Sequence, residues 1–248
     1  MVILSILFFI TAIFYSSVGF GGGSTYLALL LIWGIPYFIF PVIALLCNII
    51  VVSGNSVNYI RAGNHNFKLL LPFLVGSIPF AYIGGAITIE KEIFEILLFF
   101  VLSIAGLLLL LNNKSYSAKH LDTKKLNFTI SFLIGSVIGL VSGVVGIGGG
   151  IFLSPILFLL KADKPKIIAT TSSLFILINS ISGIMGQFSK KIVTDEIINY
   201  WPLFVVVIFG GLVGNYLNIK IFSSRVLALI TSILVIFVAV RMGYRIIF

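Results

Sequence analysis

The sequence predicts an all-α, polytopic membrane protein made of two homologous halves. Hydrophobic residues fill 60% of the 248 positions and charged residues 9%, whereas soluble domains have about 45–50% apolar and about 25% charged residues. Long uncharged runs occupy the chain, and one glycine-rich motif occurs twice. No soluble module can be separated, so we expect residues 1–248 to form a single membrane domain.

Charge-free runs give the candidate membrane helices in order. A helix needs about 20 apolar residues to cross a bilayer, and most of the runs reach that length. The first and fourth runs are too long for one straight crossing, so we expect a break in each. The runs cover residues 1–60, 69–89, 96–113, 126–160, 167–189, 197–219 and 226–240.

The first run does not resemble a signal peptide. Met1 to Phe14 contains no Lys or Arg and continues into further apolar sequence, so we expect it to be retained. Cys47 is the one cysteine, so an intrachain disulfide is excluded, and its apolar surroundings in the sequence predict a small core residue.

Ordered landmarks indicate an internal duplication. The motif VGFGGG at 18–23 recurs 127 residues later as VGIGGG at 145–150. Pro41, Asn48 and Asn55, at intervals of seven, recur as Pro165, Ser172 and Asn179, and Gly84-Gly85 recurs as Gly210-Gly211. We therefore predict internal repeats 1–113 and 126–248, joined by a polar surface loop at 112–126.

The relative orientation of the halves depends on the glycine segments. If residues 2–33 form a broken, re-entrant hairpin, each half adds about three spans and the halves are inverted repeats. Eleven of the 16 basic residues then lie on one side, against ten if the segment crosses. The positive-inside rule favours the hairpin, although Arg241 and Arg245 then lie on the poorer side.

The glycine motifs are the first candidate binding site. Each glycine costs about 1 kcal/mol in a helix interior, so both motifs should interrupt their helices. Broken helices at matching positions of two halves are typical of a transporter's midplane site, and a helix that restarts at Ser24-Thr25 or at Ile151 offers unpaired N–H groups to an anion. Close helix packing is the alternative role for these glycines. The candidates are Gly21, Gly22, Gly23, Ser24, Gly148, Gly149 and Gly150.

Neutral polar residues inside the spans form the second candidate set. A seven-residue interval is nearly two helical turns, so Asn48 and Asn55 share a face, as do Ser172 and Asn179. These side chains and Thr171 could donate hydrogen bonds to an oxyanion. The alternative is that they bond between helices, as Ser, Thr and Asn commonly do in membranes.

Missing residue types exclude several functions. No charged residue falls at the centre of a span, which argues against cation transport and a carboxylate proton relay. His65 and His120 lie in predicted loops without metal-ligand partners, and no catalytic pair or nucleotide loop is present, so we expect no metal, no cofactor and no enzyme. The net charge of +9 is scattered over short loops, which indicates membrane topology rather than nucleic-acid binding.

The motif pair resembles the sulfite exporter TauE/SafE family of membrane permeases. The matching segments are VGFGGGSTYLALLL (18–31), VGIGGGIFLSPILFLL (145–160) and IATTSSLFILINSISGIMG (168–186). The first half departs from the second, because it has no proline after its glycines and has Cys47-Asn48 in place of Thr171-Ser172. A site that is asymmetric between the halves is therefore an open alternative. The resemblance covers essentially the whole chain and implies a multi-pass protein of the cell membrane that transports sulfite, sulfonates or related organosulfur anions.

Three hypotheses follow from these features. The first is a secondary transporter of a small anion that alternates access by rocking one half against the other around the breaks. The second is an anion channel with the same site, and the third is a membrane scaffold, which the short loops disfavour. The expected partners are a small anion and the lipid bilayer, and association into a homo-oligomer stays open.

Overall fold

The computed structural model describes residues 1–111, 126–190, 196–217, 232–233, 235–240 and 243–244. Every element named in these residues is a helix, which confirms the predicted all-α class. The predicted loop at 112–126 lies almost wholly outside the described residues. The helices are α1 (Val2–Val18), α2 (Gly23–Ile32), η1 (Tyr37–Ile39), α3 (Phe40–Arg61), α4 (Phe67–Ala86), α5 (Lys91–Leu111), α6 (Phe128–Val145), α7 (Gly150–Leu159), α8 (Pro165–Phe188), η3 (Ile197–Tyr200) and α10 (Trp201–Leu217).

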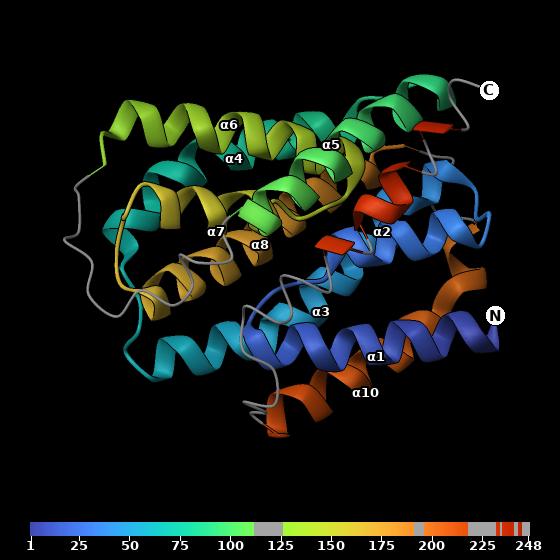
Figure 1. Cartoon of the computed structure of the whole chain (residues 1–248), viewed down its shortest axis with the longest axis horizontal. Helices are drawn as coiled ribbons and strands as arrows, with labels where there is room; N and C mark the ends of the chain where they lie inside the picture. The colour runs from blue at the N-terminus through green and yellow to red at the C-terminus, as the bar shows by residue number, and fades with distance from the viewer. Residues whose placement is uncertain (112–125, 191–195, 218–231, 234, 241–242, 245–248) are drawn as a thin grey trace.

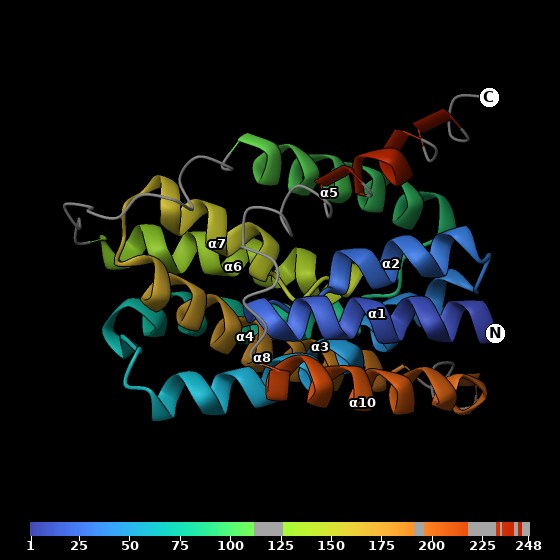
Figure 2. The ribbon, with the colours of Figure 1, turned by 60° about the horizontal axis from the view of Figure 1, so that its bottom comes forward.

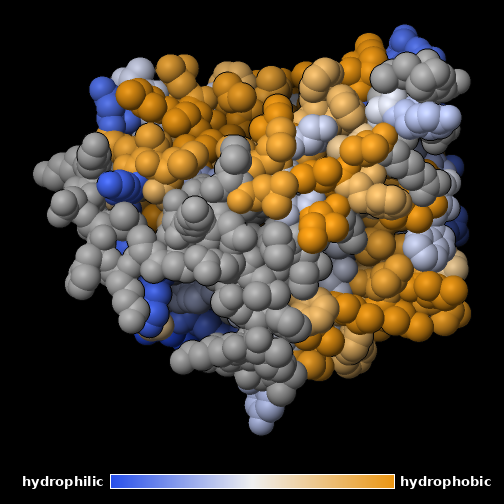
Figure 3. Space-filling model, in the orientation of Figure 1, coloured by the Kyte–Doolittle hydropathy of each residue, from blue (hydrophilic) through white to orange (hydrophobic). Residues whose placement is uncertain are grey.

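Helix length and surface chemistry both agree with a multi-pass membrane protein. In the described part, five segments are long and apolar enough to cross a bilayer: Tyr37–Arg61, Phe67–Ala86, Phe128–Val145, Lys166–Phe188 and Ile197–Tyr216. Large apolar side chains face outward, and Val137 of α6 and Leu212 of α10 are 64% and 60% exposed. Hydrophobic residues cover much of the described surface in Figure 3, and hydrophilic residues gather toward its ends. Such a surface suits lipid.

Local sequence explains where several of these helices begin. Pro41 lies in the first turn of α3, where its missing N–H costs nothing. Asn66 caps α4 by accepting a hydrogen bond from the backbone N–H of Leu69 at 3.2 Å. Asn127 caps α6 in the same way, from Thr129 at 2.9 Å.

The first and second parts of the chain are interlocked. Helix α1 packs along α10, and α6 packs along α4, so the first helix of each part lies against a late helix of the other. Helices α3 and α8 meet in the middle of the bundle. Figures 1 and 2 show these pairs side by side from two directions. The core therefore lies between the two parts.

Glycines bring the backbones of these helix pairs close together. A Cβ on Gly139 of α6 would lie 2.5 Å from the carbonyl oxygen of Ser77 in α4. A Cβ on Gly210 of α10 would lie 2.6 Å from the carbonyl oxygen of Phe9 in α1. Small residues serve this packing role in membranes, where apolar burial does little to hold helices together.

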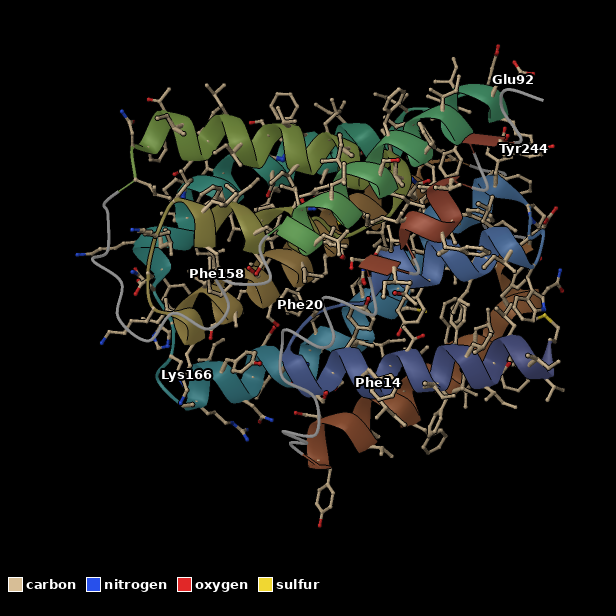
Figure 4. The ribbon with its side chains drawn as sticks, viewed as in Figure 1. Phe14, Phe20, Glu92, Phe158, Lys166 and Tyr244 are labelled. Carbon is tan, nitrogen blue, oxygen red and sulfur yellow. The ribbon has the colours of Figure 1, made fainter. Side chains whose placement is uncertain are left out.

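Charged residues lie at the two ends of the bundle. The α3–α4 and α7–α8 connections meet at one end, where Asn66 donates a 2.8 Å hydrogen bond to Asp163. We call this the basic end because it carries Arg61, Lys68, Lys161, Lys164 and Lys166. The opposite end carries Glu90, Lys91, Glu92, Glu95, Lys190 and Glu196. Figure 4 shows Lys166 and Glu92 far apart along the long axis.

Candidate functional site

Each glycine motif interrupts a helix with the same backbone pattern. The C-terminus of α1 is capped by Gly19, with φ 87°, and that of α6 by Gly146, with φ 88°. The following short helices are capped by Gly22, with φ 83°, and by Gly149, with φ 80°. Glycine adopts these left-handed conformations without the steric penalty that a Cβ imposes. The local geometry of both breaks therefore depends on the glycines themselves.

The short helices restart one residue before the predicted positions. Helix α2 begins at Gly23 rather than Ser24, and α7 begins at Gly150 rather than Ile151. The left-handed cap at Gly22 or Gly149 turns the chain, so the next glycine already has helical angles. In Figures 1 and 2 the chain reverses at each break, and the α1–α2 and α6–α7 pairs open toward opposite ends. Figure 4 shows Phe20, within the first break, near the middle of the long axis.

The N-termini of α2 and α7 are buried and lack side-chain caps in the described structure. The first intrahelical bonds run from Tyr26 N–H to Gly22 O at 3.0 Å and from both Phe152 N–H and Leu153 N–H to Gly149 O at 3.1 Å. N–H groups before these have no acceptor within their helix, and the helix dipole makes this end positive. Such an end favours a negatively charged ligand.

The side chain of Asn48, on α3, lies between the two breaks. A Cβ on Gly23 would lie 2.8 Å from its Nδ2, and a Cβ on Gly148 would lie 2.5 Å from the same atom. Gly21 also faces the Asn48 carboxamide. Asn48 is fully buried, and neither Nδ2 nor Oδ1 has a hydrogen-bond partner among the described residues. An unpaired buried polar group costs about 1–3 kcal/mol, so this position needs a reason beyond packing.

Helix α8 adds hydroxyls and a second amide beside the second break. Asn179 Nδ2 donates to Ser142 Oγ at 2.8 Å and to Gly148 O at 3.4 Å. Its Oδ1 has no partner in the described part, nor have the hydroxyls of Thr171, Ser172 and Ser180. All four side chains are buried. The described structure thus places several unpaired polar atoms on α8, with Asn179 and Ser180 beside Gly148.

The structure does not bring every predicted residue to this place. The amide of Asn55 donates to Val51 O of its own helix at 3.4 Å. A Cβ on Gly22 would lie 3.1–3.2 Å from the rings of Tyr15 and Tyr26, so its role is conformational. The five other candidate glycines and Ser24 lie at the breaks or in the first turns that follow them, as predicted from the sequence.

Ser180 and Ser142 are site neighbours that are not among the site residues predicted from the sequence. A Cβ on Gly148 would lie 3.1 Å from Ser180 Oγ. Ser180 follows Ser172 by eight residues, slightly more than two turns, so the helical period was a usable signal for it. Ser142 bonds to Asn179 from another helix, and no local pattern indicates that contact.

The chemistry of the buried polar residues is uniform. In the described part they are all Ser, Thr, Asn or Gln, and none carries a charge. Hydroxyls, amides and helix N-termini can donate to an anion without a carboxylate to repel it. The arrangement therefore suits a small anion.

Comparison with known proteins gives the same general picture. A family model described as "Sulfite exporter TauE/SafE" matches residues 4–242. The chain is 25% identical to the "Probable membrane transporter protein y4hK" of Sinorhizobium fredii, over 93% of each chain. It is 24% identical to the "Probable membrane transporter protein YunE" of Bacillus subtilis, over 100% of this chain and 98% of that one. A similarly described protein of Methanocaldococcus jannaschii is 26% identical, over 94% and 91%. No solved structure matches the chain.

Proposed function

The chain belongs to the sulfite exporter TauE/SafE family of membrane transporters, and we propose that it carries a small anion across the bilayer at the two glycine breaks. The observation that carries the proposal is the Asn48 carboxamide, which is buried without a partner among the described residues and lies between both breaks. A bound anion would accept a hydrogen bond from its Nδ2 and would face the positive ends of α2 and α7.

The proposed site combines both glycine segments with neutral polar side chains. Asn48 and the unpaired atoms of Thr171, Ser172 and Asn179 are its side-chain donors or acceptors. Gly21, Gly23, Gly148 and Gly150 keep bulk away from that space, and Gly22 and Gly149 set the turns. Ser24 contributes the first turn of α2. Asn55 is a weaker candidate because its amide already bonds to its own helix.

The contacts of equivalent glycine pairs support inverted repeats at 1–113 and 126–248. Gly84 of α4 faces α6, and Gly210 of α10 faces α1. The next residue of each pair faces a central helix, since Gly85 meets α8 and Gly211 meets α3. The broken hairpins open toward opposite ends, as re-entrant segments of inverted halves do (Figure 1). Alternating access then follows as rocking of one half against the other around the breaks.

The family description supports sulfite, a sulfonate or a related organosulfur anion as the substrate. A membrane channel using the same site is the competing function, and saturable counterflow distinguishes a carrier from it. We place the basic end on the cytoplasmic side of the cell membrane, because five of the seven described Lys and Arg residues lie there.

Reconstitution into proteoliposomes tests the proposal. The purified protein should exchange radiolabelled sulfite for internal unlabelled sulfite, with rates that saturate. Thermal-shift measurements against sulfite, thiosulfate, sulfate and short sulfonates should rank the bound anions. Absence of both flux and stabilisation across this set would contradict anion transport.

A further inference from the structure

A cavity of about 380 Å³ lies at the end opposite the basic end. Its walls come from η1 and the start of α3, from the α4–α5 connection and the start of α5, from the end of α6, and from the end of α8 with the residues just after it. Most of its lining is apolar or aromatic, and Thr88, Gln187 and Lys190 are the polar exceptions apart from the Tyr37 hydroxyl. The lining residues are Tyr37, Phe38, Pro41, Ile87, Thr88, Ile89, Phe94, Val144, Gln187 and Lys190.

The inner side of this cavity adjoins the second glycine break. Val144 precedes Gly146, the cap of α6, by two residues. Pro41 packs so closely on Gly146 that a Cβ there would collide with the Pro41 backbone. Pro41 and Asn48 are seven residues apart, so they share a face of α3 and are separated by about 10 Å along its axis. The cavity thus lies about two helical turns from the proposed binding site.

Lys190 places a positive charge on the wall of this cavity. Its ammonium donates to Gln187 Oε1 at 3.1 Å, and Gln187 Nε2 donates to Gly143 O at 2.7 Å. Among the described residues no carboxylate lies within ion-pairing distance of this ammonium. Lys190 is the one charged residue in the lining, and Tyr37 is the other titratable one. Burial lowers the pKa of Lys190 to about 8, so the lysine is mostly charged at neutral pH.

A single face of α8 connects the cavity to the breaks. Ser172, Ile176, Ser180, Gly183 and Gln187 follow one another at intervals of three or four residues, the spacing of one helix face, and Lys190, two residues beyond the end of α8, bonds to Gln187. Gly148 faces both Ile176 and Ser180. This face therefore runs from the glycines to Lys190.

We propose that the cavity is a collecting site for the transported anion, in which the Lys190 ammonium attracts the anion before it moves along α8 to Asn48. The inference rests on the proposed function. Apolar walls weaken dielectric screening, so one cation here attracts an anion more strongly than it would on an open surface. Gln187 is a positioning residue, because it holds the ammonium at the wall.

Side-specific kinetics of Lys190→Gln test this role. The variant removes the charge and keeps a hydrogen-bonding side chain. For sulfite added on the Lys190 side at low salt, KM should rise about three- to tenfold with kcat unchanged, and salt should shrink the difference. KM measured from the basic end should not change. Lys91→Gln is the matched control, since it removes one lysine charge at the same end without lining this cavity. Equal KM values for Lys190→Gln and Lys91→Gln would overturn the role, and so would a KM change in Lys190→Gln that is the same from both sides of the membrane.

Lys190→Arg and chemical labelling give two further readouts. Arginine stays charged, so the ratio of wild-type to Lys190→Arg flux should fall as pH rises through about 8, and the ionisation of sulfite cancels in this ratio. A ratio that does not change with pH contradicts the role.

Methanesulfonate should also protect Lys190, but not Lys91, from an amine-reactive reagent. This labelling does not depend on flux. Protection of Lys190 in a protein that moves no anion would contradict the transport proposal alone, whereas lack of protection would contradict the collecting site.

Discussion

Gly148 and Asn48 come from different halves of the chain, yet a Cβ on Gly148 would lie only 2.5 Å from Asn48 Nδ2. Real Cβ atoms do not approach a nitrogen that closely, so position 148 requires glycine as long as the Asn48 side chain lies where it does. Gly21 and Gly23, from the other break, face the same carboxamide. A side chain added at either break would therefore displace the same Asn48 carboxamide.

Gly21→Ala should impair transport without unfolding the protein. Gly21 does not have a left-handed φ, so alanine adds no backbone strain there. The new methyl group would meet Asn48 Oδ1 and would lie 3.1 Å from Ile176, so the carboxamide must turn away. We expect sulfite flux in proteoliposomes to fall about tenfold, a loss of about 1.4 kcal/mol of binding or transition-state stabilisation. The melting temperature should stay near that of the wild type.

Gly22→Val and Gly149→Val should abolish flux while the protein still inserts into the membrane. Both glycines are left-handed, a conformation that β-branched residues avoid at a cost of about 1–3 kcal/mol. A Cβ on Gly149 would also lie 2.7 Å from Ile138 and 2.8 Å from Phe175. Membrane fractionation and size-exclusion profiles report insertion and folding. Wild-type flux in either purified variant refutes the conformational role.

Gly210→Ala and Gly211→Ala form a matched pair for the packing of α10. A methyl group on Gly210 would meet the Phe9 carbonyl and lie 2.8 Å from Ala12, whereas Gly211 has only one neighbour, at 3.9 Å. We expect Gly210→Ala to destabilise the fold by about 1–3 kcal/mol and Gly211→Ala to be neutral or stabilising by up to about 1 kcal/mol. Thermal unfolding in detergent measures both. Equal melting temperatures would show that α1 and α10 do not pack as closely as described.

The sequence predicts the helices and the positions of the breaks because both depend on local chemistry. Uncharged runs give the membrane helices, and two runs of glycine remove helix propensity at one point in each half. The one-residue error at Ser24 and Ile151 arose because a left-handed glycine can itself serve as the helix cap. That conformation is not visible in residue type alone.

Long-range contacts set the limit of the sequence reading. The seven-residue spacing puts Asn48 and Asn55 on one face, but they differ in depth by about 10 Å, and only Asn48 meets both breaks. The packing of α1 with α10 joins residues nearly a whole chain apart, such as Ser16 and Gly211, which bond at 2.8 Å, and the packing of α6 with α4 joins the two parts of the chain again. The sequence reading put Lys190 among the scattered topogenic charges, and only the fold places it in a cavity wall.

Sulfite flux through Asn48→Asp tests the central claim most directly. The substitution nearly keeps the shape of the side chain but replaces its NH2 donor with an oxygen that can carry negative charge, between the two breaks. Asn58→Asp is the control on the same helix, where an exposed amide bonds to Asn215 at 2.8 Å. We predict that Asn48→Asp, correctly folded in proteoliposomes, loses flux about a hundredfold or more, about 2.8 kcal/mol, while Asn58→Asp keeps most of it. Near wild-type flux through Asn48→Asp would contradict an anion site at the breaks.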